Sequence, residues 1–177
     1  MKKILLLAFV LFAVHISAQE RIPVEMTNTK FYLNIITPSV AVEQRISSNQ
    51  SFLARGGIRL HAEEIEDEFD AGLLPYVEAE FRNYYPRKNV KRELNNNSGN
   101  YIGFIGGYHF DHIAGNPALE AFKYENHYYF AGLWGMQRNY KSKIHLNLHV
   151  GPAVYARDGG VDFNVLFNFH FGFVIGN

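Results

Sequence analysis

Charged residues that recur at every second position are the feature of this sequence best placed to do chemistry. Residues two apart along a β-strand share one face, and on that assumption the following side chains line one side of several strands: Glu43, Arg45, Arg55, Arg59, Glu78, Glu80 and Arg82. Buried ions are tolerated when acidic and basic groups pair. We therefore expect a charge network that seals a narrow interior. A polar path for small solutes is the functional alternative.

The eight histidines raise the question of a metal site. His145 and His149 share a strand face, but residues four apart on a strand are roughly 13 Å apart and cannot hold one ion. His109, His149 and His170 could meet only across neighbouring strands. Because a credible site needs a defined number and geometry of ligands, we expect interior hydrogen bonding instead, with no metal and no cofactor.

An enzyme that modifies lipid would need a nucleophile beside a histidine. The serines are Ser39 and residues of expected connections, and no G-x-S-x-G motif is present. We therefore infer no catalysis and keep the lipid-modifying enzyme as an alternative.

Two charged runs fall between the expected strands. The acidic run 63–70 is interpreted as a solvated surface loop, since runs of like charge are usually solvated. The basic run 87–92 is followed by Asn95-Asn96-Asn97-Ser98-Gly99, whose composition predicts a flexible connection.

Composition narrows the classes of function. The 177 residues fit one domain. The net charge is zero, with 17 basic and 17 acidic residues, so no basic patch favours nucleic acid as a partner. The sequence contains no cysteine, which excludes disulfides and thiolate metal sites.

The N-terminus has the pattern of a secretory signal peptide. Lys2 and Lys3 precede an apolar run from Ile4 to Val14, and Ala18 fits the cleavage position. The run is shorter than the roughly 20 residues of a spanning helix. The expected division is a signal peptide over residues 1–18, a periplasmic lead-in over 19–29 and an outer-membrane β-barrel over 30–177.

Alternation with a period of two predicts β-strands through the rest of the chain. In the last segment, Phe163, Phe167 and Phe171 share one face, and Asn164 and Asn168 share the other. The alternation changes phase near Thr37-Pro38, which predicts a turn there. Counting this segment as one strand or two gives seven or eight strands, and the even numbers of bacterial barrels favour eight. The expected connections are 37–38, 62–71, 111–126 and 157–160 on the outer side, and 47–50, 86–99 and 139–143 on the inner side.

Two kinds of barrel have this alternation. A soluble lipocalin-like barrel encloses the apolar face around an apolar ligand, whereas a transmembrane barrel turns that face to lipid. Phenylalanines would crowd an eight-stranded interior, and most glycines lie on the charged face. We therefore expect an all-β, up-and-down antiparallel transmembrane barrel and keep the soluble barrel as the alternative.

Several motifs resemble small outer-membrane barrel proteins. They are Leu33-Asn34-Ile35 with Thr37-Pro38-Ser39-Val40-Ala41-Val42-Glu43, the segment 75–84, and the glycine- and aromatic-rich segments 101–110 and 128–137. The chain is similar to the eight-stranded OmpA-like and OmpX-like barrels in the broad sense, and most similar to an uncharacterised outer-membrane barrel family of Bacteroidetes. The resemblance implies location in the outer membrane, contact with its lipid and insertion by the barrel assembly machinery. It implies no activity and no physiological partner.

Overall fold

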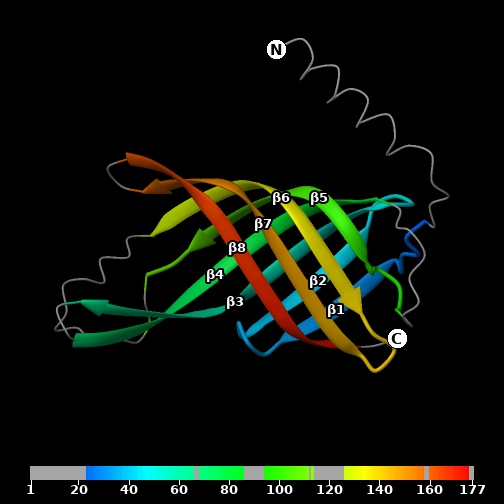
Figure 1. Cartoon of the computed structure of the whole chain (residues 1–177), viewed down its shortest axis with the longest axis horizontal. Coiled ribbons are helices and arrows are strands. Elements are labelled where there is room, and N and C mark those ends of the chain that lie inside the picture. Colours follow the sequence, from blue (N-terminus) through cyan, green and yellow to red (C-terminus); the bar gives the residue numbers. More distant parts are fainter. Residues whose placement is uncertain are drawn as a thin grey trace, which may run out of the picture.

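A closed ring of eight antiparallel strands makes up the chain in this computed structural model, which describes residues 23–65, 68–85, 94–111, 113, 126–157 and 160–175. Each strand pairs with its neighbours in the sequence, and the first pairs with the last (Figure 1). The strands are β1 (Thr29–Asn34), β2 (Ser39–Arg45), β3 (Gln50–Ile65), β4 (Glu68–Tyr85), β5 (Gly99–His109), β6 (His127–Asn139), β7 (Ile144–Arg157) and β8 (Gly160–Ile175). The all-β, up-and-down arrangement and the count of eight are confirmed.

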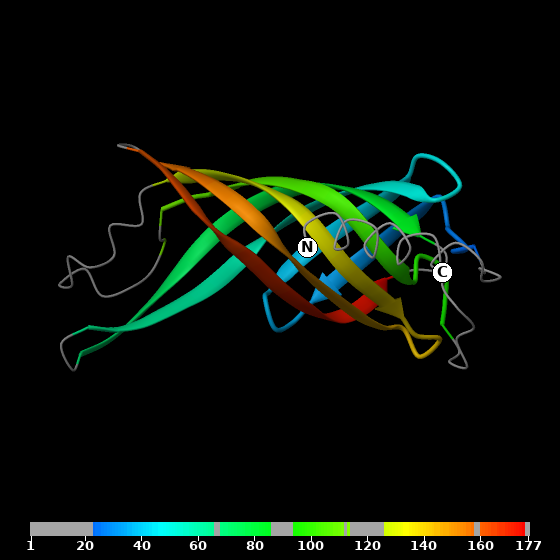
Figure 2. The same cartoon turned by 45° about the horizontal axis from the view of Figure 1, so that its top comes forward.

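The strands that form the ring differ in length, and β1 and β2 are the shortest. The segment with the change of phase forms two short strands, β1 and β2, which meet as Asn34 opposite Ser39 around a four-residue turn, 35–38. The predicted turn is therefore real but longer than residues 37–38. The β1–β2 turn ends well short of the far end reached by the β3–β4 hairpin (Figure 2).

The prediction of a loop over residues 62–71 is wrong for most of that segment. β3 and β4 stay paired up to Ile65 opposite Glu68, so most of the acidic run lies in strands and only residues 66–67 fall outside the described part. Backbone groups make the antiparallel ladder. The acidic run therefore lacks the apolar alternation that predicts strands, but its backbone still pairs β3 with β4.

The two faces of the strands differ sharply in exposure. Phe163 is 83% exposed and Phe167 is 61% exposed, whereas Glu43, Glu80 and Arg82 on the other face are 0% exposed. Small apolar clusters adjoin the buried polar side chains; one contains Tyr32, Ala41, Leu53 and Val174, and the other contains Ile105, Tyr129, Ala131, Leu133, Ala153 and Leu166. The charged face therefore lies inside the ring and the phenylalanine face outside. The predicted signal peptide, residues 1–18, lies outside the described residues.

Candidate functional site: the charged interior

Acidic and basic residues balance in the interior. The buried charged residues of the described part are three basic and three acidic: Lys30, Arg55, Arg82, Glu43, Glu78 and Glu80. Five of them belong to the predicted network. Lys30 was not predicted as a member, although it shares the alternation of Tyr32 and Asn34. The period-two pattern would have placed it on the inner face.

Glu43 is the acceptor for four neutral donors. Its Oε1 accepts hydrogen bonds from Ser51 Oγ at 2.6 Å and Tyr84 Oη at 2.7 Å. Its Oε2 accepts from Tyr32 Oη at 2.5 Å and Gln137 Nε2 at 3.0 Å. These donors come from β1, β3, β4 and β6. One carboxylate therefore ties four other strands to β2.

Arg82 lies beside Glu43 and completes the centre of the network. Its Nη2 is 2.6 Å from Glu80 Oε2, and its Nη1 is 3.9 Å from Glu43 Oε1. Nη1 also donates to Gln137 Oε1 at 2.6 Å, and the guanidinium lies 4.6 Å from the centre of the Tyr101 ring. Two carboxylates and an aromatic ring thus surround the buried guanidinium of Arg82. These contacts replace water and stabilise its charged form.

Arg55 and Glu78 form a second buried ion pair, between β3 and β4. Glu78 also accepts a hydrogen bond from Tyr129 Oη at 2.6 Å. Arg55 Nη1 lies 2.9 Å from His170 Nε2. Because a guanidinium only donates, this geometry assigns Nε2 of His170 as the acceptor and places its proton on Nδ1.

The other two predicted arginines lie apart from these pairs. Arg45 is exposed at the end of β2, where it donates to the carbonyl oxygens of Ser47 and Met26. Arg59 is half-buried and donates to Asn168 Oδ1 at 2.9 Å. The structure thus brings five of the seven predicted residues into the buried set and leaves Arg45 in solvent.

Tyrosines and glycines alternate across β5 and β6 inside the ring. Tyr101 is opposite Gly135, and Tyr129 is opposite Gly107. A Cβ at either glycine would fall on the ring of the tyrosine that faces it. Each tyrosine ring therefore packs on the backbone of the glycine opposite it. This packing fills the interior and fixes the register between β5 and β6.

One end of the interior is closed by the segment that precedes β5. Asn97, at a positive φ of 59°, is fully buried, and its carbonyl accepts from Gln137 Nε2 at 2.8 Å and Asn139 Nδ2 at 3.0 Å. Its side chain accepts from Thr27 N at 2.8 Å. The prediction that residues 95–99 are a flexible connection is therefore wrong. Asparagine tolerates the left-handed conformation and here supplies polar groups to the network.

The interior histidines bind protein groups. His145 Nδ1 lies 2.7 Å from Asn139 Oδ1, His149 Nδ1 lies 3.8 Å from Glu80 Oε1, and His109 Nδ1 lies 2.8 Å from His127 Nε2. Within the described ranges, three or more histidine, cysteine, aspartate or glutamate side chains nowhere gather as they would around a metal ion. His149 and His170 approach each other with ring centres 5.8 Å apart, and His109 pairs with His127 instead of joining them.

Comparison with known proteins leaves the family open. No protein family, curated protein or solved structure matches the chain. In the part of the chain that the structure describes, no helix has the length and apolar character to cross a membrane. The eight antiparallel strands in a closed ring agree with the resemblance noted from the sequence, and no family is identified.

Neutral residues complete the network that the charges alone suggested. Tyr32, Tyr84, Tyr101 and Gln137 are each no more than 1% exposed and bind the buried charges. They share the inward phase of Glu43 and Arg82, so alternation could have placed them inside. Their contacts across the ring depend on the register between strands, which the sequence does not contain.

Proposed function

We propose that this protein is an integral outer-membrane β-barrel whose polar interior is plugged by its own side chains. Its role is structural or one of surface interaction, without catalysis. The observation that carries the proposal is the sidedness of the ring, with bulky apolar side chains outside and paired ions inside.

The outer face supports contact with hydrocarbon. Large aliphatic or aromatic residues are exposed on seven of the eight strands, among them Phe31, Val40, Phe52, Val77, Phe104, Phe130, Phe163 and Phe167, and Val150 on β7 is half-buried. Soluble monomers rarely expose contiguous apolar patches larger than about a few hundred Å². A lipid environment removes the cost of that exposure.

Amphipathic aromatic residues lie toward the two ends of this surface. At the end where β4 finishes, Trp134 Nε1 donates to Tyr85 Oη at 2.8 Å. At the other end, the ring of Tyr108 lies 4.8 Å from Phe110 and 4.5 Å from Tyr128. Tyrosine and tryptophan are enriched where lipid meets water, so these groups support a membrane band between them.

The interior disfavours the two alternatives. A lipocalin-like barrel that binds an apolar ligand needs an apolar interior, and here Glu43, Glu80 and Arg82 occupy the centre. An enzyme needs a nucleophile beside a base. The buried strand serines instead bind other groups, Ser51 to Glu43 and Ser39 to the carbonyl of Thr37.

Membrane fractionation tests the proposal directly. The expressed protein should stay with outer membranes after washing in alkaline carbonate. In detergent it should migrate faster on a gel before boiling than after, because a closed ring with buried ion pairs resists unfolding by the detergent. Recovery as a soluble protein without detergent would overturn the proposal.

A further inference from the structure

The wall of the ring has a lateral notch between β3 and β8. Ile58 N–H donates to Pro38 O, and Ile35 N–H donates to Phe171 O. The part of β3 after Ile58 and the part of β8 before Phe171 form two edges of the sheet. Within the described residues, no strand lies between these two edges. We call this opening above the β1–β2 turn the notch.

The apolar outer surface continues along the notch. On β8, Phe163, Val165 and Phe167 are 83%, 63% and 61% exposed. Along a strand, the backbone N–H and C=O groups of successive residues point to opposite sides. The C=O of Phe171 points toward β1. The C=O groups of residues 165 and 167, an even number of positions away, therefore point into the notch. The N–H of Val165 donates to the side chain of Asn164 at 2.7 Å, as expected at an unpaired edge.

Such an edge needs polar partners at membrane depth. Backbone groups without partners cost several kcal/mol each in hydrocarbon and are tolerated there only beside protein or polar molecules. If the exposed phenylalanines of β8 face lipid, a polar group must reach the notch.

Arg59 supplies a positive charge at the notch. Its Nη2 reaches across to Asn168 Oδ1 at 2.9 Å, and its guanidinium lies 5.6 Å from the centre of the Tyr76 ring. Unlike Arg55 and Arg82, it has no carboxylate partner among the side chains that the structure describes, which leave out residues 61–71 of the β3–β4 hairpin. Asn168 is 5% exposed, and its Nδ2 has no hydrogen-bond partner in the same part of the chain. Among these described side chains, the guanidinium of Arg59 and the Nδ2 of Asn168 therefore have no anionic acceptor.

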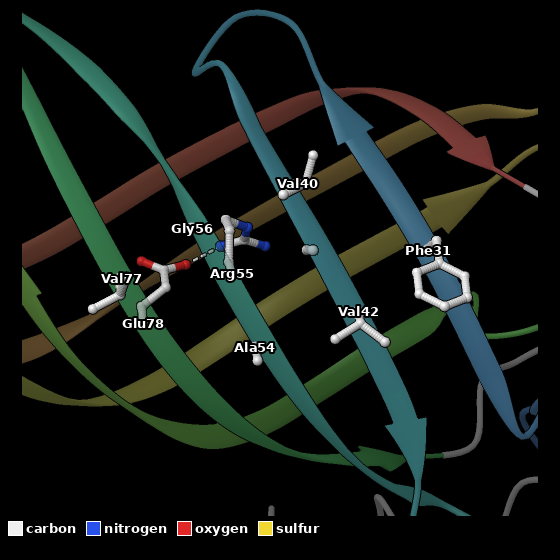
Figure 3. A pocket seen from close by; sticks show the side chains of 9 residues that line it. Phe31, Val40, Val42, Ala54, Arg55, Gly56, Val77 and Glu78 are labelled. Carbon is white, nitrogen blue, oxygen red and sulfur yellow. Dashed lines mark hydrogen bonds and ion pairs between the residues drawn. The ribbon is translucent and has the colours of Figure 1, made fainter.

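An apolar hollow begins next to the notch. The hollow has a volume of about 480 Å³ and lies against β1 to β4, with Val40, Ala54, Gly56 and Val77 among its lining residues (Figure 3). The small residues of β3 leave this space between the larger side chains of β1, β2 and β4. Arg59 follows Gly56 by three positions on the same strand, which is roughly 10 Å.

We propose that the notch and the hollow together bind a phospholipid with an anionic head group. The phosphate accepts from the guanidinium of Arg59 and from the Nδ2 of Asn168. One acyl chain lies in the hollow over Gly56. This inference rests on the proposed membrane location and names the lipid class that the wall would recognise.

Lipid retention on the purified protein in neutral detergent tests the inference. Delipidated protein is mixed with phosphatidylglycerol or with phosphatidylcholine of the same chains, and bound lipid is counted by native mass spectrometry. Both lipids carry a phosphate, but the quaternary ammonium of phosphatidylcholine leaves its head group without net charge, so phosphatidylglycerol should bind beside the cationic Arg59 at least about tenfold more tightly.

Three variants separate the contributions. Arg59→Gln should abolish the preference for phosphatidylglycerol, and Arg59→Lys should restore part of it. Arg45→Gln, at an exposed arginine remote from the notch, should leave the preference unchanged. Gly56→Leu fills the hollow and should weaken both lipids. Heat-modifiable migration shows that each variant is folded.

Two results would overturn the inference. One is equal retention of the two lipids by the wild-type protein, and the other is an unchanged preference in Arg59→Gln. If the protein stays in carbonate-washed membranes but shows either result, only the lipid site is wrong. If it is recovered as a soluble protein, the proposed function itself fails.

Discussion

Gln137 on β6 donates a hydrogen bond to Glu43 on β2 across 94 positions of sequence, at 3.0 Å. The same amide accepts from Arg82 through its oxygen at 2.6 Å. A neutral side chain thus connects an anion and a cation that lie 3.9 Å apart at their nearest atoms. This relationship joins Glu43, Gln137, Arg82 and Glu80 into one network, beside the separate Arg55–Glu78 pair.

Removing the carboxylate of Glu43 should strongly destabilise the ring. Glu43→Ala leaves four buried donors without their acceptor and takes one negative charge from a balanced interior. Loss of one partner from a buried ion pair costs about 3–5 kcal/mol, measured as the free energy of urea unfolding in lipid vesicles. Arg45→Ala, two residues along the same strand but exposed, should change it by no more than about 0.5 kcal/mol. Equal effects of the two substitutions would contradict the network.

The Arg55–Glu78 pair should show coupling in a double-mutant cycle. Arg55→Met and Glu78→Leu each leave a buried charge unpaired, and each should lower the free energy of unfolding by about 3–5 kcal/mol. The double variant should lose less than the sum, with a coupling of about 0.5–3 kcal/mol. Strict additivity would show that the two groups do not interact in the folded protein.

Two glycines of β6 should respond differently to the same substitution. Gly135→Ala places a Cβ against the ring of Tyr101. This tyrosine is fully buried, and its hydroxyl oxygen accepts a hydrogen bond from Asn147 Nδ2 at 3.0 Å. Overpacking of this kind costs about 1–3 kcal/mol. Gly132→Ala meets nothing within 4 Å and should be tolerated within about 0.5 kcal/mol. The free energy of unfolding in vesicles distinguishes them, and a tolerated Gly135→Ala would argue against this packing.

A charge on the outer face should oppose membrane insertion. Phe167→Arg puts a cation on the apolar surface, and such changes cost about 2–4 kcal/mol near the middle of the bilayer. The amount of protein in carbonate-washed outer membranes should fall. Ser142→Arg, in the exposed β6–β7 turn, serves as the control and should insert normally. No difference between them would indicate that Phe167 does not face lipid.

The reconstituted protein should not conduct ions across a planar bilayer. Arg82 and Tyr101 are among the largest fully buried side chains, and changing both to serine should produce conductance steps. The control variant with Arg45→Ser and Tyr85→Ser removes the same residue types outside the network. It should show no conductance. Steady conductance by the wild-type protein would contradict a sealed interior.

Alternation was sufficient to predict most of the fold, because each strand has one apolar and one polar face. It located the change of direction between Leu33 and Val40 and the inward position of Glu80. It failed in the acidic run, where Glu63 and Asp70 face each other across a ladder made by backbone groups. Apolar periodicity carries no information about such a segment.

The contacts of the interior needed more than alternation. Arg45 has the same phase as Glu43, yet it lies at the end of β2 and reaches solvent. Where a strand ends depends on the lengths of its neighbours. The burial of Asn97 depends on a turn that returns to the ring, for which the asparagine-rich composition alone predicted flexibility.

The ladder that joins β1 to β8 pairs only Phe31, Tyr32, Leu33 and Asn34 with Ile175, Val174, Phe173 and Gly172, whereas β3 and β4 stay paired from Gln50 to Ile65. The molecule therefore has a weak seam where its two ends meet. An open, curved sheet of β1 to β8 would close when the few backbone hydrogen bonds between β1 and β8 form. During unfolding, the β1–β8 ladder would be the first to separate.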